Sequence, residues 1–163
     1  MRQLWAPWRV EFIKGEKPPG CFFCEAAEAG PQRDAELHVL ARTEWSLAIM
    51  NRYPYNNGHL MVAPRAHLAT LEQLPPESAI DLTQVTQRSL RALRAVLKPD
   101  GFNLGINQGK VAGAGVADHV HQHVVPRWDG DTNFMPVIAE VKVMNEHLDA
   151  SYRAIREGFD RLT

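Results

Sequence analysis

The chain has 163 residues, a formal net charge of -1 and 45% hydrophobic residues. This length predicts one domain with a hydrophobic core of its own, and the near-neutral charge argues against nucleic acid or a membrane surface as a partner. Because no apolar run reaches transmembrane length and the first residues lack the features of a signal peptide, we expect a soluble cytoplasmic protein.

The first half of the chain predicts a loop and three strands. Residues 15–20 are rich in Lys, Pro and Gly and form a loop that leads to two cysteines. Strands are predicted at 37–41 and 45–50. The sequence NRYPYNNG at 51–58 has the residues of a turn, and an apolar run at 59–63 follows it as a buried strand.

The clearest helix is predicted at 76–97. Pro75 and Pro76 mark its start, because proline suits the first turn of a helix. Its arginine-rich second half indicates a solvated face that complements the helix dipole rather than a surface for nucleic acid. An apolar stripe of helical period comprises Ala79, Leu82, Val85, Leu90, Leu93 and Val96.

The second half adds two strands and a helix. Strands are predicted at 102–107 and 119–125, with a Gly/Ala-rich loop at 108–117 between them. A last helix is predicted at 145–159. The sequence therefore predicts an α+β fold with an antiparallel sheet of about five strands, one long helix and a C-terminal helix.

Three histidines alternate in the last predicted strand. His119, His121 and His123 would lie on one face, about 7 Å apart from one to the next. Three of the seven histidines in one five-residue window are poorly explained by packing. Histidine can bind a metal as a neutral imidazole or act as a nucleophile or proton carrier near neutral pH. The three alternating histidines therefore predict either one metal site that uses all three or different roles for the individual histidines.

A second pattern, Cys21-Phe22-Phe23-Cys24, indicates a metal site. Two cysteines at this spacing can reach one tetrahedral ion, and a Cys2His2 zinc site needs two histidines in addition. His67 and His119 are candidates. The alternatives are buried thiols or a redox dithiol, but the latter would open a helix in a βαβ unit, which the sequence does not predict. We favour zinc.

The segment HVHQHVV resembles the signature of the histidine triad (HIT) family, in which apolar residues separate the histidines. NRYPYNNGHLMVAP, LWAPWR and GAGVADHVHQHVVPRWDGDTNFMPV are similar to its bacterial branch of diadenosine tetraphosphate phosphorylases or hydrolases. Gln122 departs from the apolar pattern but would face away from the histidines. The resemblance implies a HIT-like fold and a homodimer. It also implies a single HIT domain over 1–163, with a zinc knuckle in 1–30 and the triad-bearing core in 31–163.

The resemblance also implies roles for the histidines. His121 would attack the α-phosphorus of a nucleotide and form a covalent nucleotidyl-histidine, which water or phosphate resolves. His123 would be catalytic as a hydrogen-bond donor to the phosphate oxygens. His119 would be a structural ligand of the zinc cofactor, and the predicted metal ligands are Cys21, Cys24, His67 and His119.

Further residues match the family's substrate contacts. Asn51 corresponds to the residue that binds the ribose hydroxyls, and Asn107 to a polar residue near the phosphate, with Gln108 as its alternative. Trp128 is a candidate for contact with the adenine or the leaving nucleotide, or else a packing aromatic. His59 would neighbour the site, and His38 and His147 would lie at the surface. The backbone N–H groups predicted to approach phosphate oxygens are those of Gly113 and Gly115.

The predicted substrate is an adenine-containing nucleotide, with diadenosine tetraphosphate as the first choice. Two alternatives remain open. One is a metal-dependent hydrolase with zinc on all three triad histidines. The other is a nucleotide-binding regulatory module without significant turnover.

Overall fold

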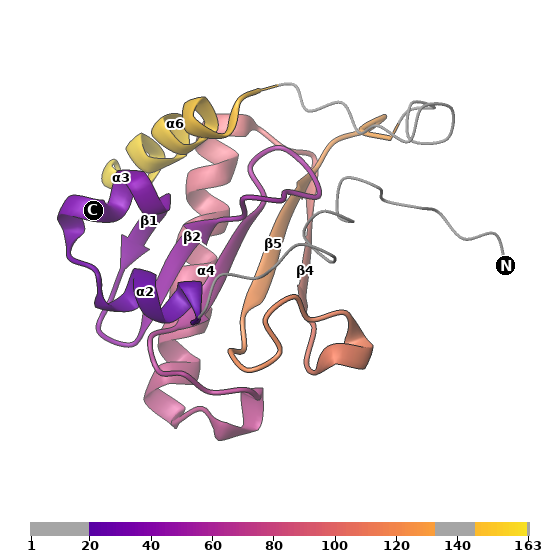
Figure 1. Ribbon diagram of the computed structural model, residues 1–163. Helices are drawn as coiled ribbons and strands as arrows, with labels where there is room; N and C mark the ends of the chain where they lie inside the picture. The colour runs from indigo at the N-terminus through magenta and orange to yellow at the C-terminus, as the bar shows by residue number, and fades with distance from the viewer. Residues whose placement is uncertain (1–19, 133–145, 163) are drawn as a thin grey trace, which may run out of the picture.

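A computed structural model describes residues 20–132 and 146–162. Its centre is a five-stranded antiparallel sheet with the order β1-β2-β3-β5-β4, and helices lie on both faces (Figure 1). The predicted α+β architecture is confirmed. The strands are β1 (Val39–Arg42), β2 (Ser46–Met50), β3 (Leu60–Pro64), β4 (Gly101–Ile106) and β5 (Gln122–Arg127). The helices are α2 (Phe22–Glu28), α3 (Asp34–Leu37), α4 (Pro76–Leu97) and α6 (Leu148–Asp160).

The long helix α4 has the bounds that the sequence predicts. Its first residue, Pro76, needs no hydrogen bond at that position, and its last turn ends at Lys98 in the left-handed conformation. Leu82, Val85 and Leu93 are buried against one face of the sheet, where α6 lies beside α4 and packs on β1. Helix and sheet thus form the larger of two hydrophobic cores.

The second core lies on the opposite face of the sheet, under α2 and α3. Successive residues of β2 alternate between the two cores, so that Leu47 and Ile49 face α2 while Ala48 and Met50 face α4. Phe23 of α2 is fully buried in this second core. Neither α2 nor α3 was predicted.

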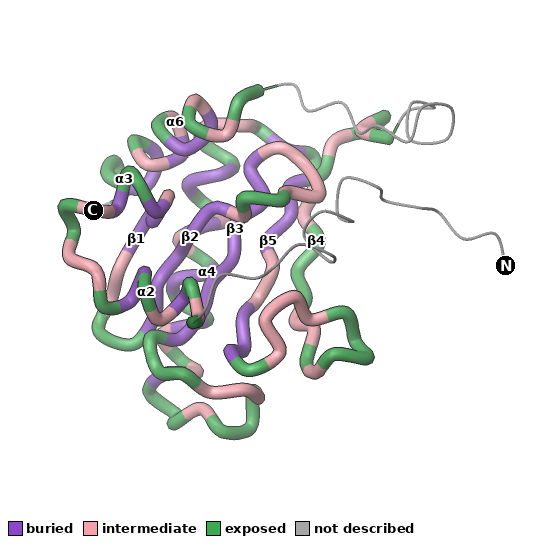
Figure 2. Tube along the Cα trace, viewed as in Figure 1, coloured by how far each residue is buried: buried purple, intermediate pink, exposed green. Residues whose placement is uncertain are grey.

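Within the described residues, helices cover the α2 side of the sheet only in part. Strands β1 to β3 are almost entirely buried, whereas β4 is exposed or intermediate along its whole length (Figure 2). Because β5 lies between β3 and β4, its α2-side residues border open space. This half of the sheet face is where the triad lies.

The last strand begins later than predicted. It comprises Gln122–Arg127 rather than 119–125, so His119 and His121 precede the strand. The Val120 N–H donates to the carbonyl oxygen of Leu68 at 2.7 Å instead of joining the sheet. The prediction that all three histidines lie on one strand is therefore wrong, because only His123 belongs to β5. The three residues nevertheless stay close in space.

Smaller differences occur at other element ends. Strand β1 starts at Val39, because His38 adopts the left-handed conformation (φ 59°) that ends α3. The His38 side chain, expected at the surface, is only 13% exposed and bonds Asp149 at 2.8 Å; that of His147 is 82% exposed, as expected. The predicted loop at 15–19 and the first residue of the predicted last helix lie outside the described residues.

Within the described ranges, no helix combines the length and apolar character that crossing a bilayer requires.

Candidate active site and metal centre

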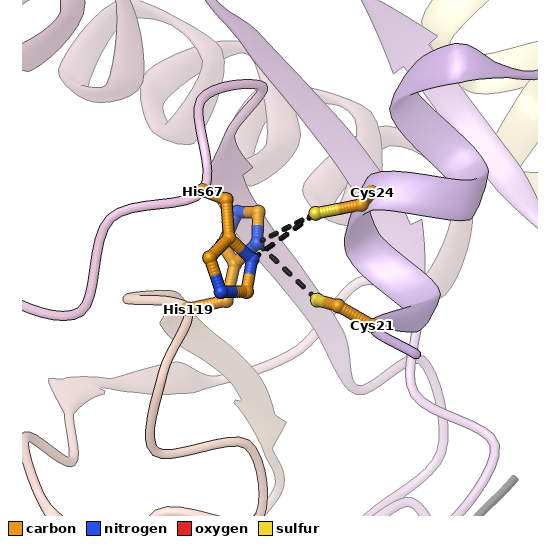
Figure 3. Close-up of side chains that lie close together, drawn as sticks. All are labelled: Cys21, Cys24, His67 and His119. Atoms are coloured by element: carbon orange, nitrogen blue, oxygen red, sulfur yellow. Dashed lines mark hydrogen bonds between the residues drawn. The ribbon is translucent and has the colours of Figure 1, made fainter. Parts of the chain in front are cut away.

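Two thiols and two imidazoles converge at one end of the sheet. Cys21, Cys24, His67 and His119 each direct a possible ligand atom into one space, and these atoms lie within 4.8 Å of one another (Figure 3). Cys24 Sγ is 3.1 Å from His67 Nδ1, and Cys21 Sγ is 3.4 Å from His119 Nδ1. Ligands around a tetrahedral zinc ion are about 3.3–3.8 Å apart, so the four residues can hold one metal ion.

Three segments of the chain bring these ligands together. Cys21 is the N-cap of α2 and Cys24 lies three residues later, so both thiols face the same side of the helix. His67 follows β3, and His119 precedes β5. The cysteines thus open a helix that the sequence did not predict, which meets one requirement of a redox dithiol. The two imidazoles directed at the thiols (Figure 3) instead favour a metal.

Hydrogen bonding decides which nitrogen of His119 can act as a ligand. Its Nε2 lies 2.8 Å from the carbonyl oxygen of Pro64, which can only accept, so Nε2 carries the hydrogen. The lone pair is then on Nδ1, the atom that faces the thiols. Burial lowers the pKa of His119, which favours this neutral form.

The Cys24 thiol favours its protonated form when no cation is bound. Burial, together with the hydrogen bond and the Coulombic effect of Cys21, raises the pKa of Cys24 to about 11. A divalent cation would reverse this preference, because thiolates are the ligands and their protons are released on binding. The cluster therefore has the electrostatics of a cation site.

The side chain of His121 presents the lone pair of one ring nitrogen. Its Nδ1 donates a hydrogen bond to the carbonyl oxygen of His119 at 2.8 Å, so the lone pair of the neutral ring is on Nε2. The residue is 3% exposed, and burial lowers its pKa while the hydrogen bond to His119 partly offsets that effect. A neutral imidazole near neutral pH is the form that can attack phosphorus.

Phe23 connects the cysteine helix to His121. Its ring centroid lies 4.9 Å from that of His121 and 5.0 Å from that of His119. The fully buried ring packs against both imidazoles, so it links the cysteine helix to His121 by direct contact. Sequence reasoning missed this residue, although its place between the two cysteines was a usable signal.

His123 is held by a second chain of hydrogen bonds that starts at the backbone of Tyr55. The Tyr55 N–H donates to His59 Nδ1 at 3.0 Å, so His59 carries its hydrogen on Nε2. That atom lies 3.0 Å from His123 Nδ1 and donates to it. His123 therefore carries its own hydrogen on Nε2, the atom that can donate to a phosphate oxygen. His59 is thus a direct neighbour of His123.

We predict that His59 is a positioning residue for His123. In a His59→Phe variant the ring volume stays but the Nε2 donor is lost, so kcat should fall about 10- to 100-fold while KM changes little. Nitrogen NMR of labelled histidines should show His123 as the Nε2–H tautomer in the wild type and as a mixture in the variant. His147→Phe, at an exposed histidine, is the matched control; an unchanged His123 tautomer in His59→Phe would contradict the prediction.

The predicted substrate contacts lie at different distances from the triad. The Asn51 side-chain nitrogen is 3.4 Å from His59 Nδ1, and Asn107 lines a groove together with His123. Gln108 bonds the backbone of Leu71 at 2.8 Å. Its side chain is therefore directed away from the site, and Asn107 is the better placed of the two.

The glycine-rich loop and Trp128 are less directly placed. The Gly113 N–H donates to the Lys110 carbonyl oxygen at 3.0 Å, and Gly115 is partly buried in the same loop. Trp128 follows β5 directly and does not line the groove beside His123. Gln122 accepts from Thr86 of α4 at 3.4 Å, so its expected orientation away from the histidines is confirmed.

The groove beside His123 is formed by β4, β5 and the turn that contains Tyr55. Its volume is about 410 Å³, and its far end holds Arg127 and Asp131, which are 2.6 Å apart. The Arg127 guanidinium holds the pKa of the Asp131 carboxyl well below its usual range. The groove thus continues the open sheet face from the triad to an ion pair.

Fold and site together define a class of protein: an α+β domain in which alternating histidines contribute to a Cys/His cluster that could hold a metal ion and to a site on the sheet face. The family model described as "HIT domain" matches residues 32–130. The chain belongs to the HIT family. The cysteine-bearing start of α2 lies ahead of the matched residues and packs onto the same domain.

Three known proteins illustrate the similarity. A protein named "AP-4-A phosphorylase" from Mycobacterium tuberculosis is 37% identical over 99% of this chain and 86% of its own length. "Adenosine 5'-monophosphoramidase hnt1" from Schizosaccharomyces pombe is 32% identical over 66% of this chain and 74% of its own. A crystal structure of a zinc-bound histidine triad family protein from Mycobacterium smegmatis has a TM-score of 0.68 and 31% identity, covering 88% of this chain and 95% of that one.

Proposed function

We propose that this protein cleaves a dinucleoside polyphosphate at its α-phosphate and that diadenosine tetraphosphate is its substrate. Membership in the HIT family and the name of the M. tuberculosis relative support this choice. The observation that carries it is the His121 Nδ1 hydrogen bond to the His119 carbonyl oxygen, which directs the lone pair to Nε2.

The proposed reaction has two displacements at phosphorus. The Nε2 lone pair of His121 attacks the α-phosphorus, a P–N bond forms, and the P–O bond to the leaving nucleotide breaks. An oxygen of water or inorganic phosphate then attacks the same phosphorus, and the P–N bond breaks to return the lone pair to His121. Two such steps replace one more difficult displacement.

Other residues would bind the substrate during these steps. His123 would donate from Nε2 to the charge that develops on the phosphate oxygens, and Asn51 would bind the ribose. Asn107 would contact the phosphate, consistent with its place beside His123 in the groove. Gly113 and Gly115 would offer backbone N–H groups and Trp128 an aromatic surface. The loop would have to adjust before Gly113 could donate, because its N–H is bonded to Lys110.

The metal in this account is a structural zinc ion. Cys21, Cys24, His67 and His119 would hold it, and the zinc-bound M. smegmatis structure supports the choice of metal. Bound there, zinc supplies rigidity rather than chemistry: it fixes His119, whose carbonyl oxygen orients His121. Tetrahedral coordination by four protein ligands is typical of structural zinc.

The alternative with zinc on all three triad histidines has weaker support. Among the described residues, the group of potential ligands that converges is the one with Cys21 and Cys24. The lone pairs of His119 and His121 are directed differently, since His119 offers Nδ1 to the thiols and His121 offers Nε2. A regulatory module without turnover remains an outcome of the experiment below.

We further propose that the protein is a cytoplasmic homodimer. The β4 edge of the sheet has an unpaired side within the described residues, and Leu104 on it is 47% exposed. An exposed edge strand is a template for pairing with a second copy. Two unpaired thiols suit a reducing compartment.

The test is incubation with diadenosine tetraphosphate, with and without inorganic phosphate. Adenosine diphosphate formed only with phosphate would identify a phosphorylase, and adenosine monophosphate formed without it a hydrolase. Tight binding with no product from either condition would overturn the proposal in favour of a regulatory module.

A further inference from the structure

A strand glycine leaves the sheet face beside His123 clear. Gly105 of β4 lies directly opposite His123 of β5, so a side chain at this position would project from the same face. A Cβ atom built on Gly105 meets nothing within 4 Å, and the residue's φ is not in the left-handed region. Neither backbone conformation nor packing requires glycine here. Glycine weakens a strand and often marks a place where a ligand approaches closely.

The space that Gly105 leaves belongs to the groove of about 410 Å³. The volume lies within the range of roughly 300–1,000 Å³ that is typical of ligand pockets. The groove extends from His123 along β5 toward Arg127, a length of about 13 Å for four strand residues. It is large enough for a nucleoside.

The polar groups of the groove suit an uncharged ligand. Arg127 donates to Asp131 from Nε and from a terminal nitrogen, at 2.6 and 2.8 Å, and to Asn103 Oδ1 at 2.7 Å. The charges of Arg127 and Asp131 thus cancel within the protein. The remaining lining includes the Asn103 and Asn107 amides and the Tyr55 ring, which can bond and stack on a base or ribose. A triphosphate would instead meet the carboxylate of Asp131.

The groove is preformed. Asn56 donates from its side-chain nitrogen to Asp131 Oδ2 at 2.8 Å and to the Pro126 carbonyl oxygen at 3.1 Å. These bonds tie the turn at 51–58 to the end of β5. A ligand would therefore meet walls that are already in place, which lowers the entropic cost of binding.

The side on which the leaving group departs also points to this groove. In a displacement at phosphorus the leaving group departs on the side opposite the attacking atom. His123, Val125 and Arg127 follow one another along the groove at increasing distance from His121. We infer that the groove binds the nucleoside end of the leaving nucleotide and that Gly105 is a specificity-determining position; this inference rests on the proposed function.

A Gly105→Val variant tests this inference with two substrates. Diadenosine tetraphosphate and adenosine 5'-tetraphosphate have the same number of phosphates, but only the first has a second nucleoside. Valine suits a strand and meets no atom of the protein, so the fold should be kept. We expect kcat/KM for the dinucleotide to fall at least about tenfold and that for adenosine 5'-tetraphosphate to change less than about twofold.

Gly101→Val is the matched control. Gly101 is the first residue of the same strand and has the same empty space around its Cβ. It lies opposite Arg127, four residues from Gly105 and at the end of the groove farthest from His123, and does not itself line the groove. It should leave the ratio of the two kcat/KM values unchanged. Equal losses for both substrates in Gly105→Val, or the same change of ratio in Gly101→Val, would overturn the inference.

Two further measurements separate this inference from the proposed function. Calorimetric titration of both compounds into His121→Ala protein reports binding without turnover. In the double variant His121→Ala/Gly105→Val, the affinity for the dinucleotide should fall by a factor similar to its loss of kcat/KM, and the affinity for adenosine 5'-tetraphosphate should not change. If the wild type turns over neither compound, the proposed function fails. The titration then still shows whether the groove binds the second nucleoside. Light scattering must show the same oligomeric state for Gly105→Val and wild type; a change would mean that the space serves a second copy of the chain and would overturn the inference.

Discussion

A His121→Ala variant should lose about a thousandfold or more of its kcat with diadenosine tetraphosphate. The substitution removes Nε2 of His121, the atom that bonds to phosphorus in the first displacement. The remaining residues of the site can then only bind the substrate. Because Nε2 of His121 is presented by a hydrogen bond to the His119 carbonyl oxygen rather than by the metal cluster, metal content should stay unchanged. Rapid-quench kinetics and elemental analysis of the same samples check both statements.

The control for this prediction is His147→Ala, at a histidine whose side chain is 82% exposed and far along the chain from the triad. It should keep wild-type kcat. Turnover within a few fold of wild type in His121→Ala would contradict the assignment of the nucleophile. Loss of metal together with activity would instead favour the three-histidine zinc site.

A Cys21→Ser variant should lose its bound zinc and much of its stability. A ligand present at a thousand times its Kd stabilises the folded state by about 4 kcal/mol, and this free energy of unfolding disappears with the site. For a chain of this length the loss corresponds to a decrease in Tm of about 10 °C. Calorimetry of zinc-loaded wild type and variant measures it, and elemental analysis reports the metal.

Chelation provides the comparison for the thiol variant. Chelated wild type should melt at nearly the same temperature as Cys21→Ser, while a chelator should leave the Tm of Cys21→Ser unchanged. Activity should decline in both through loss of order at Phe23 and His119, which pack on or bond His121. Equal Tm values for wild type with and without zinc would contradict a structural role for the metal.

Strong local signals made much of this architecture predictable. Helix α4 has prolines at its start and a left-handed residue followed by proline at its end, so its predicted bounds agree with the structure. The alternation of His119, His121 and His123 placed these residues near one another without any knowledge of the fold. The spacing of Cys21 and Cys24 similarly indicated a shared ligand site, which the structure completes with His67 and His119.

Long-range contacts determined what the sequence did not predict. Helix α2 is short, and its helical state is stabilised by burial of Phe23 against the sheet and the histidines rather than by a local pattern. His119 and His121 leave the strand register because the Leu68 carbonyl oxygen binds the Val120 N–H. Such a bond joins residues 52 positions apart and has no signature in either segment.

The tautomers of the triad histidines also depend on tertiary contacts. The His59 side chain fixes the tautomer of His123, and the Pro64 carbonyl oxygen fixes that of His119. The sequence indicated that His59 is near the site but gave no basis for assigning hydrogens. The sequence showed Gly105 only as a glycine inside a predicted strand, which is a weak signal. Its significance depends on its pairing with His123, which the structure shows.

Trapping the covalent nucleotidyl-histidine is the most direct test of the proposed mechanism. Wild-type protein should be mixed with diadenosine tetraphosphate, quenched under alkaline conditions that preserve phosphoramidates, digested and analysed by mass spectrometry. We predict an adenylyl group on His121, absent from His121→Ala protein treated identically. An adenylyl group on another residue, or product formation at full rate with no adduct at any quench time, would contradict the account.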